Sequence, residues 1–298
     1  MPQFGRLLTA MVTPMTADLS VDYSRTHALA ERLLAQGSEG LVVAGTTGEA
    51  PTLSPEEKLK LFTTVVEAVR GQAPVFAGTS TYNTAESVHL TQAALRTGVD
   101  GFLLTTPYYN KPPQEGLYRH FRAIAEAATG RPCMLYNIPS RSVVNVAAAT
   151  TVRLAHDVPN IVAIKECGEA AQVPTILCGA PAGFDVYSGD DATALPWLSM
   201  GAAGVVSVAS HVVGPQMRKL IDAFCAGDVA AAAAWNRKLM PVFRALFTTT
   251  NPILVKAALG ELGFDVGGLR LPLVEATEAE RAALRKALLE AGLLSAVR

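Results

Sequence analysis

The sequence predicts an α/β protein: a (β/α)8 TIM barrel followed by a C-terminal helical extension. Eight short apolar segments alternate with amphipathic ones, and each pair spans roughly 25–35 residues, the length of a βαβ unit. Half of the 298 residues are hydrophobic and only 17% are charged, which suits a sheet covered by helices. An open doubly wound sheet is the competing architecture, but no strand is followed by a GxGxxG turn.

The predicted strands are apolar runs bounded by glycine, proline or polar residues. The run at 161–164 is unbroken and rich in β-branched residues, as expected for a strand with both faces buried in a parallel sheet. The eight strands are expected at 7–12, 40–45, 74–79, 101–106, 133–138, 161–166, 185–189 and 204–209.

The helices between the strands have recognisable start and stop signals. Ser54-Pro55-Glu56-Glu57 is a capping box with proline at the first helical position, and Gly37, Gly71 and Gly98 close helices. After about residue 214 the chain is expected to be helical, so residues 1–226 are assigned to the barrel and 227–298 to the extension. The helices predicted there are 215–226, 228–247, 251–262 and 277–292.

The net charge, the hydrophobic pattern and the cysteine spacing argue against several classes of protein. The net charge of -1 gives no reason to expect binding to nucleic acid or an anionic membrane. The first 14 residues lack the pattern of a secretory signal, and the longest weakly polar run, 200–217, is too interrupted for a membrane span. Four widely spaced cysteines without a CxxC pair predict reduced thiols rather than disulfides or a zinc site. We therefore expect a soluble, cytoplasmic protein.

Lys165 is the first candidate for chemistry, because it stands at the inner end of the strand 161–166. A lysine desolvated there would populate the neutral amine, which is a nucleophile toward ketones. The alternative is that its stem carries the charge out to water, because charged residues are rarely fully buried.

Other reactive residues follow the remaining strands, where the active site of a barrel enzyme is built. The turn GTTGE (45–49) offers Thr46 and Thr47 to a carboxylate, although it could be only a tight polar turn. Tyr136 ends a strand and Arg141 follows it, where a guanidinium could grip a carboxylate or remain a solvated charge.

Two pairs of adjacent identical residues can each be interpreted in more than one way. Tyr108 and Tyr109 lie in a proline-bounded loop, where tyrosines serve packing, a subunit interface or proton transfer. Asp190 and Asp191 could bind a metal, but the five histidines show no ligand spacing, so we predict no metal site and place Asp191 as a helix cap. Without a metal, an aldol-type reaction would need an imine on Lys165.

These motifs, in this order, resemble the dihydrodipicolinate synthase (4-hydroxy-tetrahydrodipicolinate synthase) family, part of a pyruvate-dependent class I aldolase group that includes N-acetylneuraminate lyase. The resemblance runs from about residue 9 to 294. Its most specific pieces are GTTGE (45–49), TPYYNKPPQEGLYRHF (106–121), LYNIPSR (135–141), IKE (164–166), SGDD (188–191) and NPILVK (251–256).

The resemblance implies an aldol condensation of pyruvate with aspartate 4-semialdehyde. Lys165 would form the imine with pyruvate. Thr46, Thr47 and the Gly189 backbone would hold the pyruvate carboxylate or line its pocket, with Val206 nearby.

Further roles follow from the same resemblance. Tyr136 and Thr47 would relay protons together with Tyr109, which in this family crosses a dimer interface. Arg141 would grip the carboxylate of the aldehyde. No organic cofactor or catalytic metal is implied, and the implied assembly is a homotetramer, a dimer of dimers.

The family also has a lysine-feedback site at the dimer interface, onto which Tyr108 and Glu86 fit. Four neighbouring positions differ from those of lysine-sensitive bacterial members, which often carry Ser, His, His and Asn there. These positions are Ala50, Pro55, Lys58 and Tyr82, and their identities weaken the expectation of feedback.

Two other functions compete with this one. Within the same chemistry, the chain could be a retro-aldol lyase acting on a sugar acid or a hydroxy-oxo acid. Arg141 argues for the condensation instead, because a short carboxylated aldehyde needs a cation whereas a polyol needs hydroxyl-binding groups. A non-catalytic pyruvate sensor is the third possibility, but every reactive residue named above is present.

Overall fold

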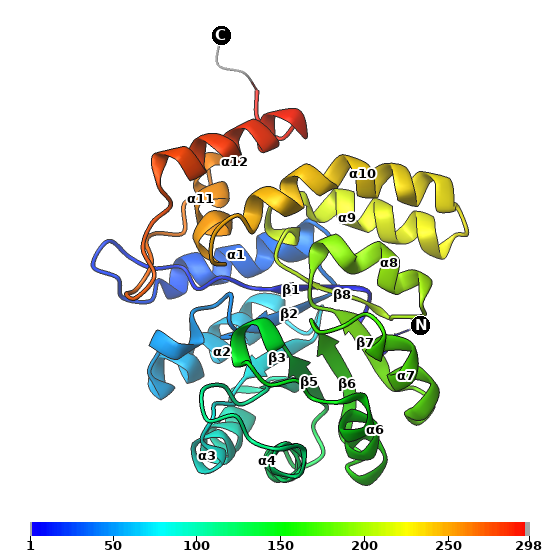
Figure 1. Ribbon diagram of the computed structural model, residues 1–298. Helices are drawn as coiled ribbons and strands as arrows, with labels where there is room; N and C mark the ends of the chain where they lie inside the picture. The colour runs from blue at the N-terminus through cyan, green and yellow to red at the C-terminus, as the bar shows by residue number, and fades with distance from the viewer. Residues whose placement is uncertain (1, 296–298) are drawn as a thin grey trace.

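The computed structural model describes residues 2–295, and in that range eight parallel strands close into a barrel (Figure 1). Each strand pairs with the next along the chain, and β8 pairs with β1 to complete the circle. The predicted (β/α)8 barrel is therefore confirmed. The strands are β1 Leu7–Ala10, β2 Gly40–Val43, β3 Val75–Gly78, β4 Gly101–Thr105, β5 Cys133–Asn137, β6 Ile161–Glu166, β7 Asp185–Ser188 and β8 Gly204–Ser207.

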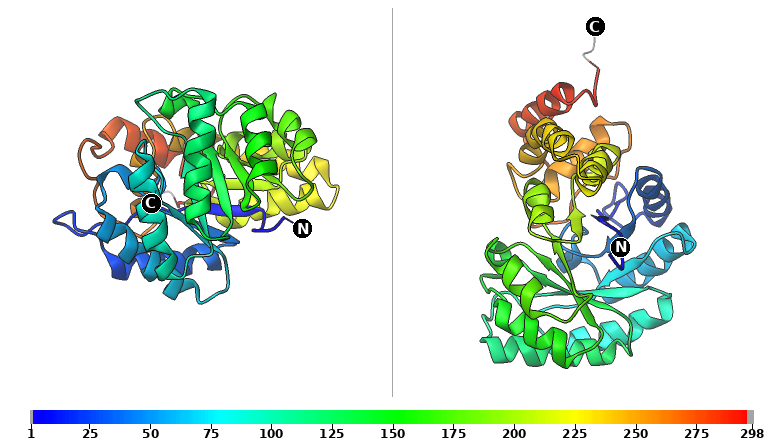
Figure 2. Two further views of the ribbon diagram at one scale, coloured as in Figure 1. Left: turned by 90° about the horizontal axis from the view of Figure 1, so that it is seen from below. Right: turned by 90° about the vertical axis from the view of Figure 1, so that its right-hand side faces the viewer.

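Helices follow the strands and cover the outside of the barrel (Figures 1 and 2). Within the described residues they are α1 Tyr23–Ala35, α2 Pro55–Val69, α3 Thr84–Ala94, α4 Gln114–Ala127, α5 Pro139–Ser142, α6 Ala148–Asp157, α7 Gln172–Gly179, α8 Ala194–Ser199, α9 Ser210–Cys225, α10 Val229–Leu246, α11 Ile253–Glu261 and α12 Glu278–Glu290. Short 3-10 turns occupy η1 Ala50–Thr52, η2 Leu95–Thr97 and η3 Asp191–Thr193.

The predicted strands match the structure closely, apart from the strand ends. The strand 161–166 has the predicted bounds, whereas the other seven end one or two residues earlier than predicted. The predicted strands are too long, because residues at the mouth of the barrel are still buried after the last residue that pairs with a neighbouring strand. The capping box at Ser54 and Glu57 is present as predicted.

Side chains fill the centre of the barrel. Alternate residues of a strand point to the same face, so Ala163 and Lys165 of β6 both point inward, with Lys165 nearer the C-terminal end. Ala163 belongs to the inner apolar cluster, whose other members include Leu8, Val42, Phe76, Leu103, Met134, Tyr136, Tyr187 and Val206. The packed interior leaves the C-terminal ends of the strands as the place for a site.

The C-terminal helices pack together on one side of the barrel (Figure 2). The helix predicted at 215–226 is the second part of α9, which begins at Ser210 and has a kink at Val213, two residues before Pro215. The division at 226/227 remains a prediction, and residues 296–298 of the proposed extension lie outside the described residues. No helix in residues 2–295 is long and apolar enough to cross a membrane.

Candidate active site

Lys165 lies inside the mouth of the barrel and is only 4% exposed, so its stem does not carry the charge to solvent. Its Nζ stands over the ring of Tyr136, 4.3 Å from the ring centre. The two residues are direct neighbours in the β5–β6 ladder, and Tyr187 flanks Lys165 on β7. The structure thus brings Lys165 and Tyr136 together.

Burial lowers the pKa of Lys165, because the ammonium loses its hydration. Cys167 and Asp191 oppose that change, and the Arg141 guanidinium reinforces it. Lys256, another buried lysine near the site, is paired with a carboxylate, whereas Lys165 has no ion-pair partner among the described residues. The neutral amine of Lys165 is therefore populated at lower pH than that of a free lysine.

Tyr136 is 3% exposed, and burial raises the pKa of its hydroxyl, so it is a proton donor at neutral pH. The hydroxyl faces the side chains of Thr46 and Cys167. Cys167 follows Lys165 by two residues and shares its direction. In the described part of the chain no hydrogen bond joins Tyr136 directly to Thr47.

Gly189, directly after β7, borders the Lys165 side chain. A Cβ on Gly189 would lie 2.1 Å from the Cys167 sulfur and 2.9 Å from Cε of Lys165, so only glycine fits there. The N–H of Gly189 donates to the Glu166 carbonyl oxygen at 2.8 Å. That N–H is therefore already paired within the backbone. Val206 is fully buried in the inner cluster.

The GTTGE turn is fixed by residues from the C-terminal region. Thr47 is 3% exposed, and its Oγ1 accepts a hydrogen bond from Nδ2 of Asn251 at 2.9 Å. Glu49 is buried and pairs with Nζ of Lys256 at 2.9 Å. Lys256 also donates to the carbonyl oxygens of Thr13 and Gly268. The loop after β2 is thereby held to α11 by a buried ion pair.

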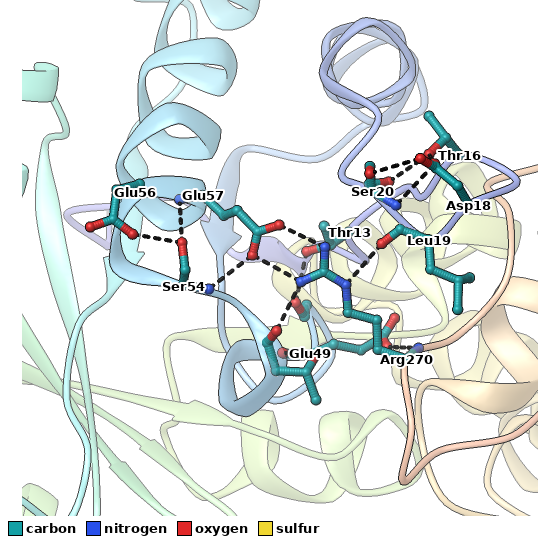
Figure 3. Close-up of polar contacts among 12 residues, drawn as sticks. Thr13, Thr16, Asp18, Leu19, Ser20, Glu49, Ser54, Glu56, Glu57 and Arg270 are labelled. Carbon is teal, nitrogen blue, oxygen red and sulfur yellow. Dashed lines mark hydrogen bonds and ion pairs between the residues drawn. The ribbon is translucent and has the colours of Figure 1, made fainter.

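A second ion pair supports the same turn (Figure 3). The backbone N–H of Arg270 donates to the second carboxylate oxygen of Glu49 at 3.0 Å. The Arg270 guanidinium binds both carboxylate oxygens of Glu57, at 2.6 and 2.8 Å, and donates to the carbonyl oxygens of Leu19 and Thr52. These bonds fasten the segment around Arg270 to the start of α2, next to the GTTGE turn.

Arg141 belongs to the short helix α5, directly after β5. Its Nη2 donates to the backbone carbonyl oxygen of Asn251 at 3.1 Å. It has no carboxylate partner among the described residues and lines a cavity of about 210 Å³ with Thr46, Tyr108 and Ile138. The guanidinium is therefore available to a carboxylate that enters this cavity.

The prediction that Asp191 caps a helix was wrong. The cap is Asp190, whose carboxylate accepts from the N–H of Ala192 at 2.8 Å. Asp191 is buried instead and accepts from Ser207 Oγ and from the N–H groups of Val208 and Ala209. Burial raises the pKa of its carboxyl to about 6, and its charge acts on Lys165.

Tyr109 stands apart from the other predicted residues. It is 87% exposed and adopts a left-handed φ of 74°, so in the single chain its ring faces away from the core. Tyr108 is turned inward and packs edge to face on Tyr82, with the ring centres 5.1 Å apart. A cavity of about 230 Å³ brings Tyr108 together with Glu86 and also with Ala50, Lys58 and Tyr82.

Three residues at the site had no assigned role in the sequence analysis. Asn251 and Lys256 begin and end the motif NPILVK, but only the fold shows that they contact the GTTGE turn. Cys167 could have been found from strand periodicity, because it lies two positions after Lys165.

Comparison with known proteins identifies the family. The sequence profile of the "Dihydrodipicolinate synthetase family" matches residues 3–291. The 4-hydroxy-tetrahydrodipicolinate synthase of Symbiobacterium thermophilum is 68% identical over 294 residues, covering 99% of this chain and 100% of the relative. That of Desulforamulus reducens is 55% identical over 278 residues, covering 93% of this chain and 94% of the relative.

A solved structure shares the whole fold. The crystal structure of the Cyanidioschyzon merolae enzyme with lysine bound superimposes with a TM-score of 0.97 at 46% identity, covering 99% of this chain and 100% of the other. Together with the family match over nearly the full length, this shows that the chain belongs to the dihydrodipicolinate synthetase family.

Proposed function

We propose that Lys165 is the imine-forming residue of a 4-hydroxy-tetrahydrodipicolinate synthase, the activity of the relatives reported above. The chain is a lyase that condenses pyruvate with L-aspartate 4-semialdehyde in lysine and diaminopimelate biosynthesis. The observation that supports Lys165 most is its position: a buried amine without a carboxylate partner among the described residues, 4.3 Å from the centre of the Tyr136 ring.

The first half of the reaction activates pyruvate. The neutral amine of Lys165 attacks the ketone carbon, loss of one water gives an imine, and the imine nitrogen then takes one proton from Tyr136. Removal of a proton from the methyl carbon then gives an enamine, with the imine nitrogen as the electron sink. Thr46 and Thr47 would bind the pyruvate carboxylate, while Gly189 and Val206 would leave room for it.

The second half builds the new bond. The enamine carbon attacks the aldehyde of the second substrate, and the resulting alkoxide takes a proton. The substrate's own amine then attacks the imine carbon, closes the ring and releases Lys165. Tyr136 would supply and recover protons, because its high pKa keeps the hydroxyl protonated between steps.

In this proposal, Arg141 determines which aldehyde binds as the second substrate. It borders the cavity of about 210 Å³ together with Thr46, which also faces Tyr136. A carboxylated aldehyde would meet a guanidinium that has no carboxylate partner in residues 2–295, which supports the condensation over a lyase acting on a polyol. The steps use side chains of the protein and the substrate's own amine, so the proposed mechanism requires no organic cofactor and no metal.

We further propose that the enzyme works as a homotetramer, a dimer of dimers, in the cytoplasm. The exposure of Tyr109 supports a role in the site of a neighbouring subunit. The four cysteines are free thiols, as is usual in a reducing compartment.

Substrate consumption followed by proton NMR tests this function. Pyruvate and aspartate 4-semialdehyde should disappear together in the presence of the wild-type enzyme. Arg141→Ala should raise the KM for the aldehyde far more than that for pyruvate. Equal effects on both substrates would remove Arg141 from acceptor binding, and no consumption by the wild-type enzyme would contradict the assigned reaction.

A further inference from the structure

Glu166 follows Lys165 in β6 and therefore points to the opposite face of the strand, away from the centre of the barrel. It is completely buried. Its Oε1 accepts hydrogen bonds from Nδ2 of Asn137 at 2.8 Å and from the backbone N–H of Gly168. Its Oε2 is buried and has no donor among residues 2–295. Burying a carboxyl group in this way costs folding free energy, which indicates a role beyond packing.

Asn137 connects Glu166 to residues 138–144, the α5 loop. Asn137 is the last residue of β5 and is also completely buried. Its Nδ2 carries two hydrogens and donates to Asn145 Oδ1 at 2.7 Å as well as to Glu166. Its Oδ1 accepts from the backbone N–H of Val146 at 2.9 Å. The side chain of Asn137 thus binds the two residues that follow the α5 loop and closes the loop at its base.

Glu166 fixes the orientation of the Asn137 amide. An amide NH2 group can only donate and an amide oxygen can only accept. If the amide were turned over, its oxygen would face Oε1 of Glu166 and its NH2 group would face the N–H of Val146, so both bonds would be lost. Burial raises the pKa of Glu166 to about 7, but the unpaired Oε2 can take the proton, so Oε1 remains an acceptor in both forms.

The α5 loop has little structure of its own. Its helix α5 is a single turn of four residues, which is too short to be stable without contacts at its ends. Arg141 lies in this turn and borders the cavity of about 210 Å³ in which the aldehyde is proposed to bind. The position of the guanidinium therefore depends on the bonds that Asn137 makes at the base of the loop.

We propose that Glu166 is a positioning residue for the second substrate: through the Asn137 amide it holds the α5 loop so that Arg141 meets the substrate carboxylate. This inference rests on the proposed function, in which Arg141 binds the aldehyde. Because Glu166 and Lys165 point to opposite faces of β6, imine formation with pyruvate does not involve Glu166.

Two substitutions of Glu166 separate its accepting oxygen from its size. Glu166→Leu removes the acceptor and leaves an apolar side chain of similar volume. The KM for aspartate 4-semialdehyde should rise by roughly 10- to 100-fold, the scale of a misplaced binding group, while the KM for pyruvate stays unchanged. Glu166→Gln keeps an oxygen that accepts from Asn137 and Gly168, so it should restore a KM close to that of the wild type.

A double-mutant cycle tests whether the effect passes through Arg141. In the Arg141→Ala background there is no guanidinium to place, so Glu166→Leu should raise the KM for the aldehyde no further. Glu169→Leu is the matched control, because it changes an exposed carboxylate three residues along the chain. Both KM values of this control should equal those of the wild type.

Hydrogen exchange measured by mass spectrometry gives a readout that does not depend on activity. The buried N–H of Val146 should exchange faster in Glu166→Leu and at the wild-type rate in Glu166→Gln. Exchange in α10 should be the same in all variants, because a loss confined to the α5 loop does not reach the C-terminal helices. Faster exchange throughout the chain would instead show general destabilisation and would overturn the inference.

Borohydride trapping of the pyruvate imine counts the folded, competent sites of each variant. If Glu166→Leu forms no sites, Asn145→Ala replaces it, because this exposed residue loosens the same loop without disturbing the sheet. Its KM for the aldehyde alone should rise.

Three results would contradict the inference: equal rises in both KM values, equal losses in the Leu and Gln variants, or an unchanged KM for the aldehyde in the variant that folds. A full additional loss in the Arg141→Ala background would also contradict it. Failure of the proposed function would show differently, as a wild-type protein that forms no adduct and consumes no substrate.

Discussion

Lys165 and Tyr136 are neighbours across the β5–β6 ladder, and the amine of one stands over the ring of the other. Both side chains point into the barrel at the C-terminal end of their strands. The pair therefore joins a nucleophile whose pKa is lowered by burial to a hydroxyl whose pKa is raised by burial. Imine formation needs an unprotonated amine and a protonated acid. The two opposite pKa changes favour both forms at the same pH.

The charge of Asp191 should set the pH dependence of imine formation. The pKa of Asp191 is about 6, so above that pH its carboxylate favours the protonated form of Lys165. The neutral amine reacts, so kcat/KM for pyruvate should rise as pH increases through the pKa of Lys165. Asp191→Asn removes the attraction and should shift this rising limb to lower pH.

Asp190→Asn is the control, because it makes the same substitution one residue away at an exposed position. Its pH profile should stay close to that of the wild type. A rising limb that moves to higher pH in Asp191→Asn, or does not move, would contradict the role given to Asp191.

The buried pair Glu49–Lys256 should contribute strongly to stability. Both side chains are almost fully buried, so Glu49→Gln leaves a lysine charge without a partner. Breaking such a pair costs about 3–5 kcal/mol of unfolding free energy. Urea denaturation should show this loss, together with reduced activity from the loosened GTTGE turn.

Two comparisons test that interpretation. Adding Lys256→Met to Glu49→Gln should recover part of the stability, because no charge then remains buried. Glu126→Gln breaks the exposed pair with Arg122 and should cost less than about 1 kcal/mol. Similar losses for the buried and exposed pairs would refute the importance given to Glu49.

Mixing two inactive variants should reveal whether Tyr109 acts in a neighbouring subunit. Lys165→Ala lacks the nucleophile and Tyr109→Phe lacks the exposed hydroxyl. In a mixed dimer, the chain that retains Lys165 would receive Tyr109 from the other chain, which rebuilds one complete site. Activity should therefore return after subunit exchange. If both groups act within one chain, the mixture would gain nothing.

Lys58 should weaken the binding of free lysine in the cavity that contains Glu86 and Tyr108. Lys58 is buried there, and Glu86 is the charge that stabilises its ammonium. A ligand ammonium would have to compete for the same carboxylate. Lys58→Met should therefore tighten L-lysine binding in calorimetry and strengthen inhibition, whereas unchanged affinity would show that Lys58 does not oppose the ligand.

The fold and the nucleophile could be predicted because their signals are local. Apolar runs alternating with capped helices define the barrel, and Lys165 ends the clearest of those runs. The strand ends could not be placed as well, since side chains at the mouth of the barrel stay buried after the ladder stops.

Contacts between distant segments could not be predicted. Asn251 is separated from Thr47 by 204 residues and from Arg141 by 110, so no pattern in either motif indicates that they meet. Asp190 rather than Asp191 is the cap, because η3 begins at Asp191, one residue earlier than a cap at Asp191 would require. Either aspartate satisfies the rule for a cap, and only the packing of β8 selects which one is buried.

The most direct test of the central claim is mass spectrometry after borohydride reduction in the presence of pyruvate. One reduced pyruvate adduct per chain should form, located on Lys165. It should be absent in Lys165→Ala and retained in Lys238→Met, which changes an exposed lysine. An adduct on another lysine, or undiminished turnover in Lys165→Ala, would show that Lys165 is not the imine-forming residue.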